Sequence, residues 1–173
     1  ASLVGSEMCI RDRYCVQKNI DRSGGAGLPG AMGESMHLSK QIESMYDDAV
    51  RIRQDLHRIP EIGFQLRDTQ AYVLRELKQC GPDRIETPAV CGVKAVFFAK
   101  DAETTIAFRA DMDGIHNDEA NDVPYCSQHP GNMHGCGHDG HMTILLLFAR
   151  WIAKNRAHIH CNIVLLFQPG EEG

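Results

Sequence analysis

The chain has 173 residues, enough for one domain with a sizeable hydrophobic core. It carries 18 basic and 23 acidic residues, a formal net charge of −5, and no block of Lys and Arg of the kind that binds nucleic acid. Its longest apolar runs, residues 144–149 and 163–167, are far shorter than the about 20 residues of a membrane span, so the sequence predicts no membrane helix.

The first 38 residues show no convincing periodicity, and we expect them to be a disordered or non-native leader. Residues 23–30 are typical of a flexible linker, and residues 1–13 resemble a translated adaptor more than native protein. The start lacks the features of a signal peptide. The seven cysteines are odd in number and form no CxxC pair, so they favour a reduced, cytoplasmic protein over a disulfide framework.

Three helices are predicted from the spacing of apolar residues. The first begins at Ser39, a suitable N-cap, and ends at Pro60. Its apolar stripe comprises Ile42, Met45, Ala49, Ile52, Leu56 and Ile59. The second covers about residues 68–79 with Gly81 just beyond it, and its inward residues are Ala71, Leu74 and Leu77. The third runs from residue 139 or 140 to about 154, with an apolar face of Ile144, Leu145, Phe148, Trp151 and Ile152.

Strands are predicted at residues 92–99, 105–109 and 162–168. The last contains a continuous apolar run, which is typical of a strand buried on both faces. Strands that alternate with helices indicate an α/β fold with a mostly parallel central sheet flanked by helices. If the sheet ends at the strand of residues 162–168, we expect that strand to expose a long unpaired edge.

Three polar clusters lie next to these predicted elements. Residues 109–114 and 168–173 each follow a strand, and residues 134–141 lead into the last helix. Because ligands bind beyond the carboxyl ends of strands in open α/β sheets, we expect the three clusters to open onto the same edge.

The residue types in these clusters favour metal chemistry. Cys136 and His138 flank one glycine, and thiolate and imidazole are good ligands for zinc and related ions. Asp139 or Asp111 is a candidate to hold the other ring nitrogen of a ligating histidine. In the pair after the last strand, Glu171 and Glu172, one carboxylate can bind a metal while the other takes a proton from activated water.

Each cluster also has a simpler interpretation. The Cys-Gly-His triplet can be unrelated to metal, the two glutamates can lie in a solvated loop, and Asp111 and Asp113 can close a strand or cap a helix. His134 and His141 stay open between contacting a substrate and merely packing.

Five ordered blocks resemble the metallopeptidase-like amidohydrolases that include hippurate hydrolase, N-acyl-amino-acid amidohydrolases and plant auxin-conjugate hydrolases. The blocks are residues 53–64, 108–113, 121–125, 133–141 and 167–173, so the resemblance covers about residues 40–173. It implies Cys136, His138 and Glu172 as ligands of two divalent ions, commonly manganese or zinc, with Cys136 as the bridge. It further implies Glu171 as the general base and Asp111 as a supporting acidic residue.

The resemblance implies a function as well: a small N-acyl amino acid is the expected substrate, and water activated by the metals cleaves its amide bond. Family members continue with two further histidine ligands and a smaller domain that helps them dimerise. Residues 39–173 are therefore expected to be the N-terminal part of the catalytic domain of a homodimer or higher oligomer, and to be inactive alone. Residues 113–117 depart from the family's usual Asp-Ala-Leu-Pro.

Three other functions remain open. A dipeptidase or aminopeptidase would use the same metal centre. A different class of enzyme would use Cys136 as a nucleophile paired with His138 or His141. A truncated and catalytically inert product is the third possibility.

Overall fold

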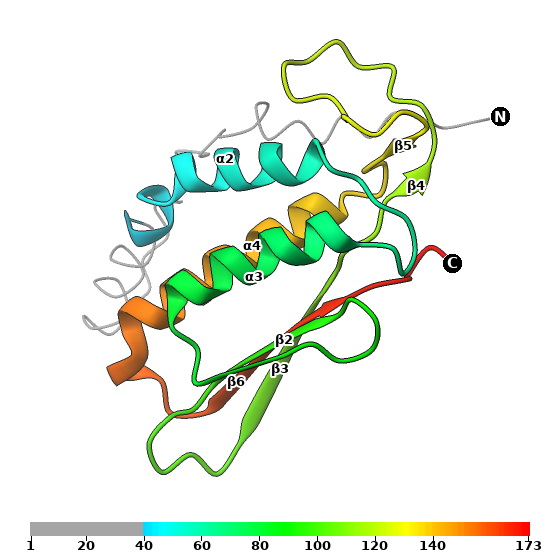
Figure 1. Cartoon of the computed structure of the whole chain (residues 1–173). Coiled ribbons are helices and arrows are strands. Elements are labelled where there is room, and N and C mark those ends of the chain that lie inside the picture. Colours follow the sequence, from blue (N-terminus) through cyan, green and yellow to red (C-terminus); the bar gives the residue numbers. More distant parts are fainter. Residues whose placement is uncertain (1–39) are drawn as a thin grey trace, which may run out of the picture. The chain divides into compact units, whose positions relative to one another are not determined.

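The computed structural model describes residues 40–173, so the predictions for residues 1–38 and for the cap at Ser39 lie outside the described part. The elements follow one another in an α/β order (Figure 1). They are α2 (Tyr46–His57), α3 (Arg67–Cys80), β1 (Arg84–Glu86), β2 (Val93–Phe97), β3 (Thr105–Asp111), β4 (Ile115–His116), β5 (Asn132–Met133), α4 (His138–Asn155), the 3-10 turn η1 (Arg156–His158) and β6 (Asn162–Gln168).

The main sheet has the order β1-β2-β6-β3 and is mixed. Only β3 and β6 are parallel within it, with Thr105 opposite Asn162 and Asp111 opposite Gln168. The two other pairs, β1 with β2 and β2 with β6, are antiparallel. The predicted α/β class is confirmed, but the described sheet is not mostly parallel. The connections explain this, because parallel neighbours need a crossover of about a dozen residues or more and only the β3-to-β6 connection contains a helix.

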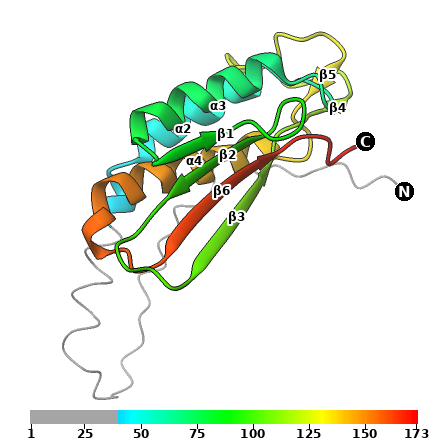
Figure 2. The same cartoon turned by 60° about the horizontal axis from the view of Figure 1, so that its bottom comes forward.

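Strand β6 lies inside the sheet, between β2 and β3. The prediction that this strand forms an exposed edge is therefore wrong. The edge strands of the described sheet are β1 and β3, and on β3 Ile106 is 48% exposed. Along β6 buried residues such as Leu165 alternate with half-buried ones such as Leu166. The helices lie on one face of the sheet (Figure 2), so the prediction that β6 is buried on both faces is also wrong.

Helices α3 and α4 pack against the sheet, and α2 packs against α4 (Figure 1). The end of α3 is as predicted, since Gly81 caps it in the left-handed conformation with φ of 58°. The inward faces differ from the predicted ones by a small rotation. Ala71 on α3 is exposed, and Ile144 on α4 is 69% exposed. The buried face of α4 comprises Met142, Leu145, Leu146, Ala149 and Ile152.

A buried carboxylate joins the three helices at a distance from the polar clusters. Glu76 on α3 is 3% exposed, and its Oε2 lies 2.6 Å from Nη2 of Arg150 on α4. The same oxygen lies 3.3 Å from Nη2 of Arg51 on α2. This carboxylate therefore stabilises the packing of the helices through two cations.

Two further predictions concern the chain as a whole. Within residues 40–173, no helix has the length and apolar content needed to cross a membrane. The five cysteines in that part, Cys80, Cys91, Cys126, Cys136 and Cys161, are all unpaired, as expected for a protein without a disulfide framework.

Candidate metal centre

His138 is the first residue of α4, and its ring is held from behind. Gly137 precedes it with φ of 82°, a left-handed conformation that favours glycine. The His138 Nδ1 lies 2.7 Å from the main-chain oxygen of Asp113, to which it donates. That bond leaves the Nε2 lone pair available, as in ligating histidines whose other nitrogen is anchored. The prediction that Asp139 or Asp111 anchors this histidine is therefore wrong.

Asp113 also fixes the two glutamates that follow β6. Its side chain is fully buried, and its Oδ1 accepts the N–H of Glu171 at 3.2 Å while its Oδ2 accepts that of Glu172 at 3.0 Å. The turn before them needs glycine: Gly170 has φ of 71°, and a Cβ there would lie 2.6 Å from the Phe64 ring. Asp113 thus organises both sides of the site, a role that the sequence did not reveal.

These anchors bring His138, Glu171 and Glu172 together. Each offers one ligand atom, and the three atoms lie within 4.8 Å of one another. The Nε2 of His138 is 3.7 Å from Oε2 of Glu171 and 3.8 Å from Oε1 of Glu172. The predicted convergence of the second and third clusters is visible in these distances.

Cys136 is exposed and lies beside the same carboxylates. A hydrogen bond to Glu172, burial and the charges of Glu172, Glu171 and Asp113 raise the pKa of its thiol to about 11. Negative charge around a thiol disfavours the thiolate, and a divalent cation in that position reverses the effect. The donor set of thiol, imidazole and carboxylate suits zinc and related ions. The residues of the site therefore fit a divalent metal.

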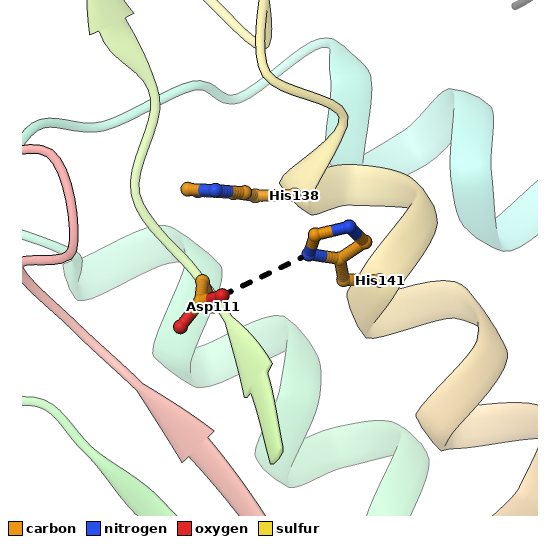
Figure 3. A group of neighbouring side chains, drawn as sticks. All are labelled: Asp111, His138 and His141. Carbon is orange, nitrogen blue, oxygen red and sulfur yellow. Dashed lines mark ion pairs between the residues drawn. The ribbon is translucent and has the colours of Figure 1, made fainter.

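Asp111, from the first cluster, lies on the β3 side of His138 (Figure 3). It is 8% exposed, and its Oδ2 is 3.8 Å from Nδ1 of His141, one turn along α4. Asp111, His138 and His141 form a second group whose ligand atoms lie within 4.8 Å of one another. Arg109 Nη2 lies 3.1 Å from Asp111 Oδ1, an ion pair without hydrogen-bond geometry. All three predicted clusters thus meet at His138.

Two histidines lie behind the site: His57, which the sequence reasoning missed, and His134, which it left open between contacting a substrate and packing. Asp139 binds His57 at 2.6 Å rather than a ligating histidine. His134 is 4% exposed, and neither ring nitrogen has a hydrogen-bond partner among the described residues. Burial lowers the pKa of His134 to about 4, which keeps its ring neutral. His57 is buried beside Leu56 at the end of α2, but it lies outside the apolar stripe of that helix, so helical periodicity did not single it out.

Comparison with known proteins places these features in a family. Residues 107–173, which include all three clusters, match the model of peptidase family M20/M25/M40. An N-acetyldiaminopimelate deacetylase of Exiguobacterium sibiricum is 41% identical over 130 residues, which are 72% of this chain and 34% of that protein. The enzyme of the same description from Bacillus subtilis is 42% identical over 129 residues, or 73% of this chain and 34% of the relative. The chain spans about a third of the length of these curated relatives.

A solved structure leads to the same family. It is a Bacillus subtilis protein described as a dinuclear metal-binding peptidase from the M20 family, and it superposes with a TM-score of 0.71 at 30% identity. The superposition covers 75% of this chain and 36% of that one. The matched sequence, the shared fold and the convergence of the three clusters agree: residues 107–173 are part of a domain of peptidase family M20/M25/M40.

Proposed function

We propose that the protein is a metal-dependent amidohydrolase that removes the acyl group from N-acyl amino acids. The observation that carries the proposal is the group of His138, Glu171 and Glu172, whose ligand atoms lie within 4.8 Å of one another beside Cys136. The N-acetyldiaminopimelate deacetylases among the relatives favour an acetyl group on an amino acid as the substrate. A benzoyl group, as in hippurate, is the other acyl group to test.

Cys136, His138 and Glu172 are the residues that would hold the metal. The description of the structural relative as dinuclear supports two ions, with manganese and zinc as the candidates. When bound, such ions activate water and polarise the carbonyl group that is attacked. The buried bond from His138 Nδ1 to the Asp113 carbonyl orients the imidazole for this task.

Glu171 would be the general base. Its side chain is 42% exposed, and its backbone is fixed by Asp113 while its carboxylate stays 3.7 Å from the His138 ring. It accepts the proton of the attacking water and returns it to the leaving amine. Asp111 would act as a fixed negative charge on the other side of His138, next to His141.

The test is a substrate panel on the complete, metal-loaded protein: N-acetyldiaminopimelate, benzoylglycine and a free dipeptide, each before and after chelation and after return of manganese or zinc. We expect hydrolysis of an N-acyl amino acid, lost on chelation and restored by metal. Faster cleavage of the free dipeptide would favour a peptidase with the same centre. Activity that resists chelation would refute metal-dependent chemistry.

A further inference from the structure

A buried network of charges lies behind the candidate metal centre. His57, the last residue of α2, has its Nδ1 2.6 Å from Oδ2 of Asp139 and its Nε2 3.0 Å from Oε1 of Glu119. The three side chains are 6%, 0% and 4% exposed. Because both partners are carboxylates, both ring nitrogens must donate, and the ring is an imidazolium. Arg53, 3.1 Å from Asp139 Oδ2, balances the second carboxylate.

The surroundings keep the charge on this ring. Burial lowers the pKa of His57, but the hydrogen bonds to Asp139 and Glu119 outweigh burial and raise it overall. Burial raises the pKa of the Asp139 carboxyl, but the hydrogen bond from His57 and the charges of Arg53 and His57 together outweigh burial and lower the pKa overall. The other rings that face His57 are those of Tyr125, edge-on at 5.7 Å, and His134, which is neutral. The network therefore contains two positive and two negative groups, of which Arg53, with its side chain 21% exposed, is the one that reaches solvent most.

The partners of His57 lie in the first turn of α4 and in the loop between β4 and β5, the two segments on either side of Cys136. Asp139 follows His138 in the first turn of α4, and its Oδ1 also accepts the N–H of Gly140 at 2.8 Å. The carboxylate of this residue therefore ties the start of α4 to the end of α2. Any displacement of that turn displaces the His138 ring with it.

Glu119 lies in the loop of residues 117–131 between β4 and β5, which Figure 1 shows beside the end of α2. Its Oε2 accepts the N–H of Ser127 at 2.7 Å, which closes the loop on itself. Strand β4 begins two residues after Asp113, and β5 ends three residues before Cys136. Holding this loop therefore holds the two short strands that lie next to Asp113 and Cys136 in the chain.

We propose that His57 is a positioning residue for the metal centre: shared between Asp139 and Glu119, it locks the first turn of α4 and the β4–β5 loop onto α2 and so sets where Cys136 and His138 lie relative to Glu172. This inference rests on the proposed metal-dependent function. It adds a residue that touches neither metal nor substrate. His57 acts only through the two segments it joins.

Cobalt titration of the complete, metal-free protein tests this directly, because thiolate-to-cobalt absorption reports on Cys136 and the d–d bands report on ligand geometry. Loss of an interaction that orients metal ligands costs about 10- to 100-fold in metal affinity, and we expect H57Q to lose at least tenfold and to shift the d–d bands. E119Q, a milder change that leaves His57 in place, should lose less. The matched control is E76Q, which removes the charge of the buried carboxylate on α3 that pairs with Arg150 on α4 and Arg51 on α2. It should lower Tm and leave cobalt binding unchanged.

Hydrogen exchange on the metal-free proteins provides the second readout. H57Q and E119Q should raise exchange in residues 115–141, whereas E76Q should raise it around residue 76 and residue 150. Wild-type cobalt affinity and spectrum in both H57Q and E119Q would overturn the inference, as would an equal loss of affinity in E76Q. If the unmodified protein binds no cobalt, the proposed function fails, and the exchange data alone decide whether His57 holds these segments: protection unchanged in H57Q overturns it.

Discussion

Metal binding should expel the proton of the Cys136 thiol, and this makes the affinity steeply dependent on pH. A thiol with a pKa of about 11 is ionised in only about one molecule in 10,000 at pH 7. The metal binds the thiolate, so the apparent association constant for the metal rises about tenfold with each unit of pH until the pH reaches that pKa. Between pH 7 and pH 9 the ionisation of Cys136 should therefore raise the metal affinity about 100-fold. This corresponds to the release of one proton from each site when the metal binds.

Calorimetric titration with zinc at each pH, in two buffers of different protonation enthalpy, measures the affinity and counts the protons released. C136A serves as the control, because it should bind more weakly and lose the thiol proton from the count. An affinity that changes less than threefold between pH 7 and pH 9 would show that Cys136 is not a ligand, or that its thiol is already ionised. Equal proton release from the wild type and C136A would refute the reasoning in the same way.

Two changes test the framework that supports the site. G170A places a Cβ 2.6 Å from the Phe64 ring at a residue with φ of 71°. It should lower the unfolding free energy by about 1–2 kcal/mol from the backbone alone and should weaken metal binding. The control G131A, with φ of 81° and open space around it, should leave metal binding intact. Normal zinc affinity in G170A would contradict the need for glycine before Glu171. E76Q should lower the unfolding free energy, measured by chemical denaturation, by about 2 kcal/mol. This is less than the cost of breaking a fully buried pair, because Arg150 retains its ion pair with Asp48 at 2.6 Å and the Arg51 side chain is 43% exposed. A change below about 0.5 kcal/mol would show that the network contributes little.

Local sequence patterns predicted the elements well and their mutual arrangement less well. The bounds of β6 and the cap of α3 at Gly81 follow from an apolar run and a glycine at a left-handed position. The prediction of a mostly parallel sheet was wrong for β2, which is antiparallel to β6, because strand direction depends on connections, not on composition. The seven residues between β2 and β3 are too few for a crossover, and that length was the missed clue.

The candidate site was predictable in its residue types and not in its internal bonds. Cys136, His138, Glu171 and Glu172 were identified because metal-ligating side chains at the ends of predicted elements point to one edge. The His138 ring is anchored by the main-chain oxygen of Asp113. A main-chain oxygen is present at every residue, so no pattern of side chains singles it out. His57 was missed for a related reason, since its two partners lie 62 and 82 positions away in the chain.

The most direct test of the account compares E171Q with the wild type in the complete, metal-loaded protein, with metal content and the rate of deacylation measured on the same samples. If Glu171 is the general base and Glu172 the ligand, E171Q should keep its metal and lose about 10²- to 10⁴-fold in kcat. A rate within a few-fold of the wild type at equal metal content would contradict the assignment on which the proposed mechanism depends.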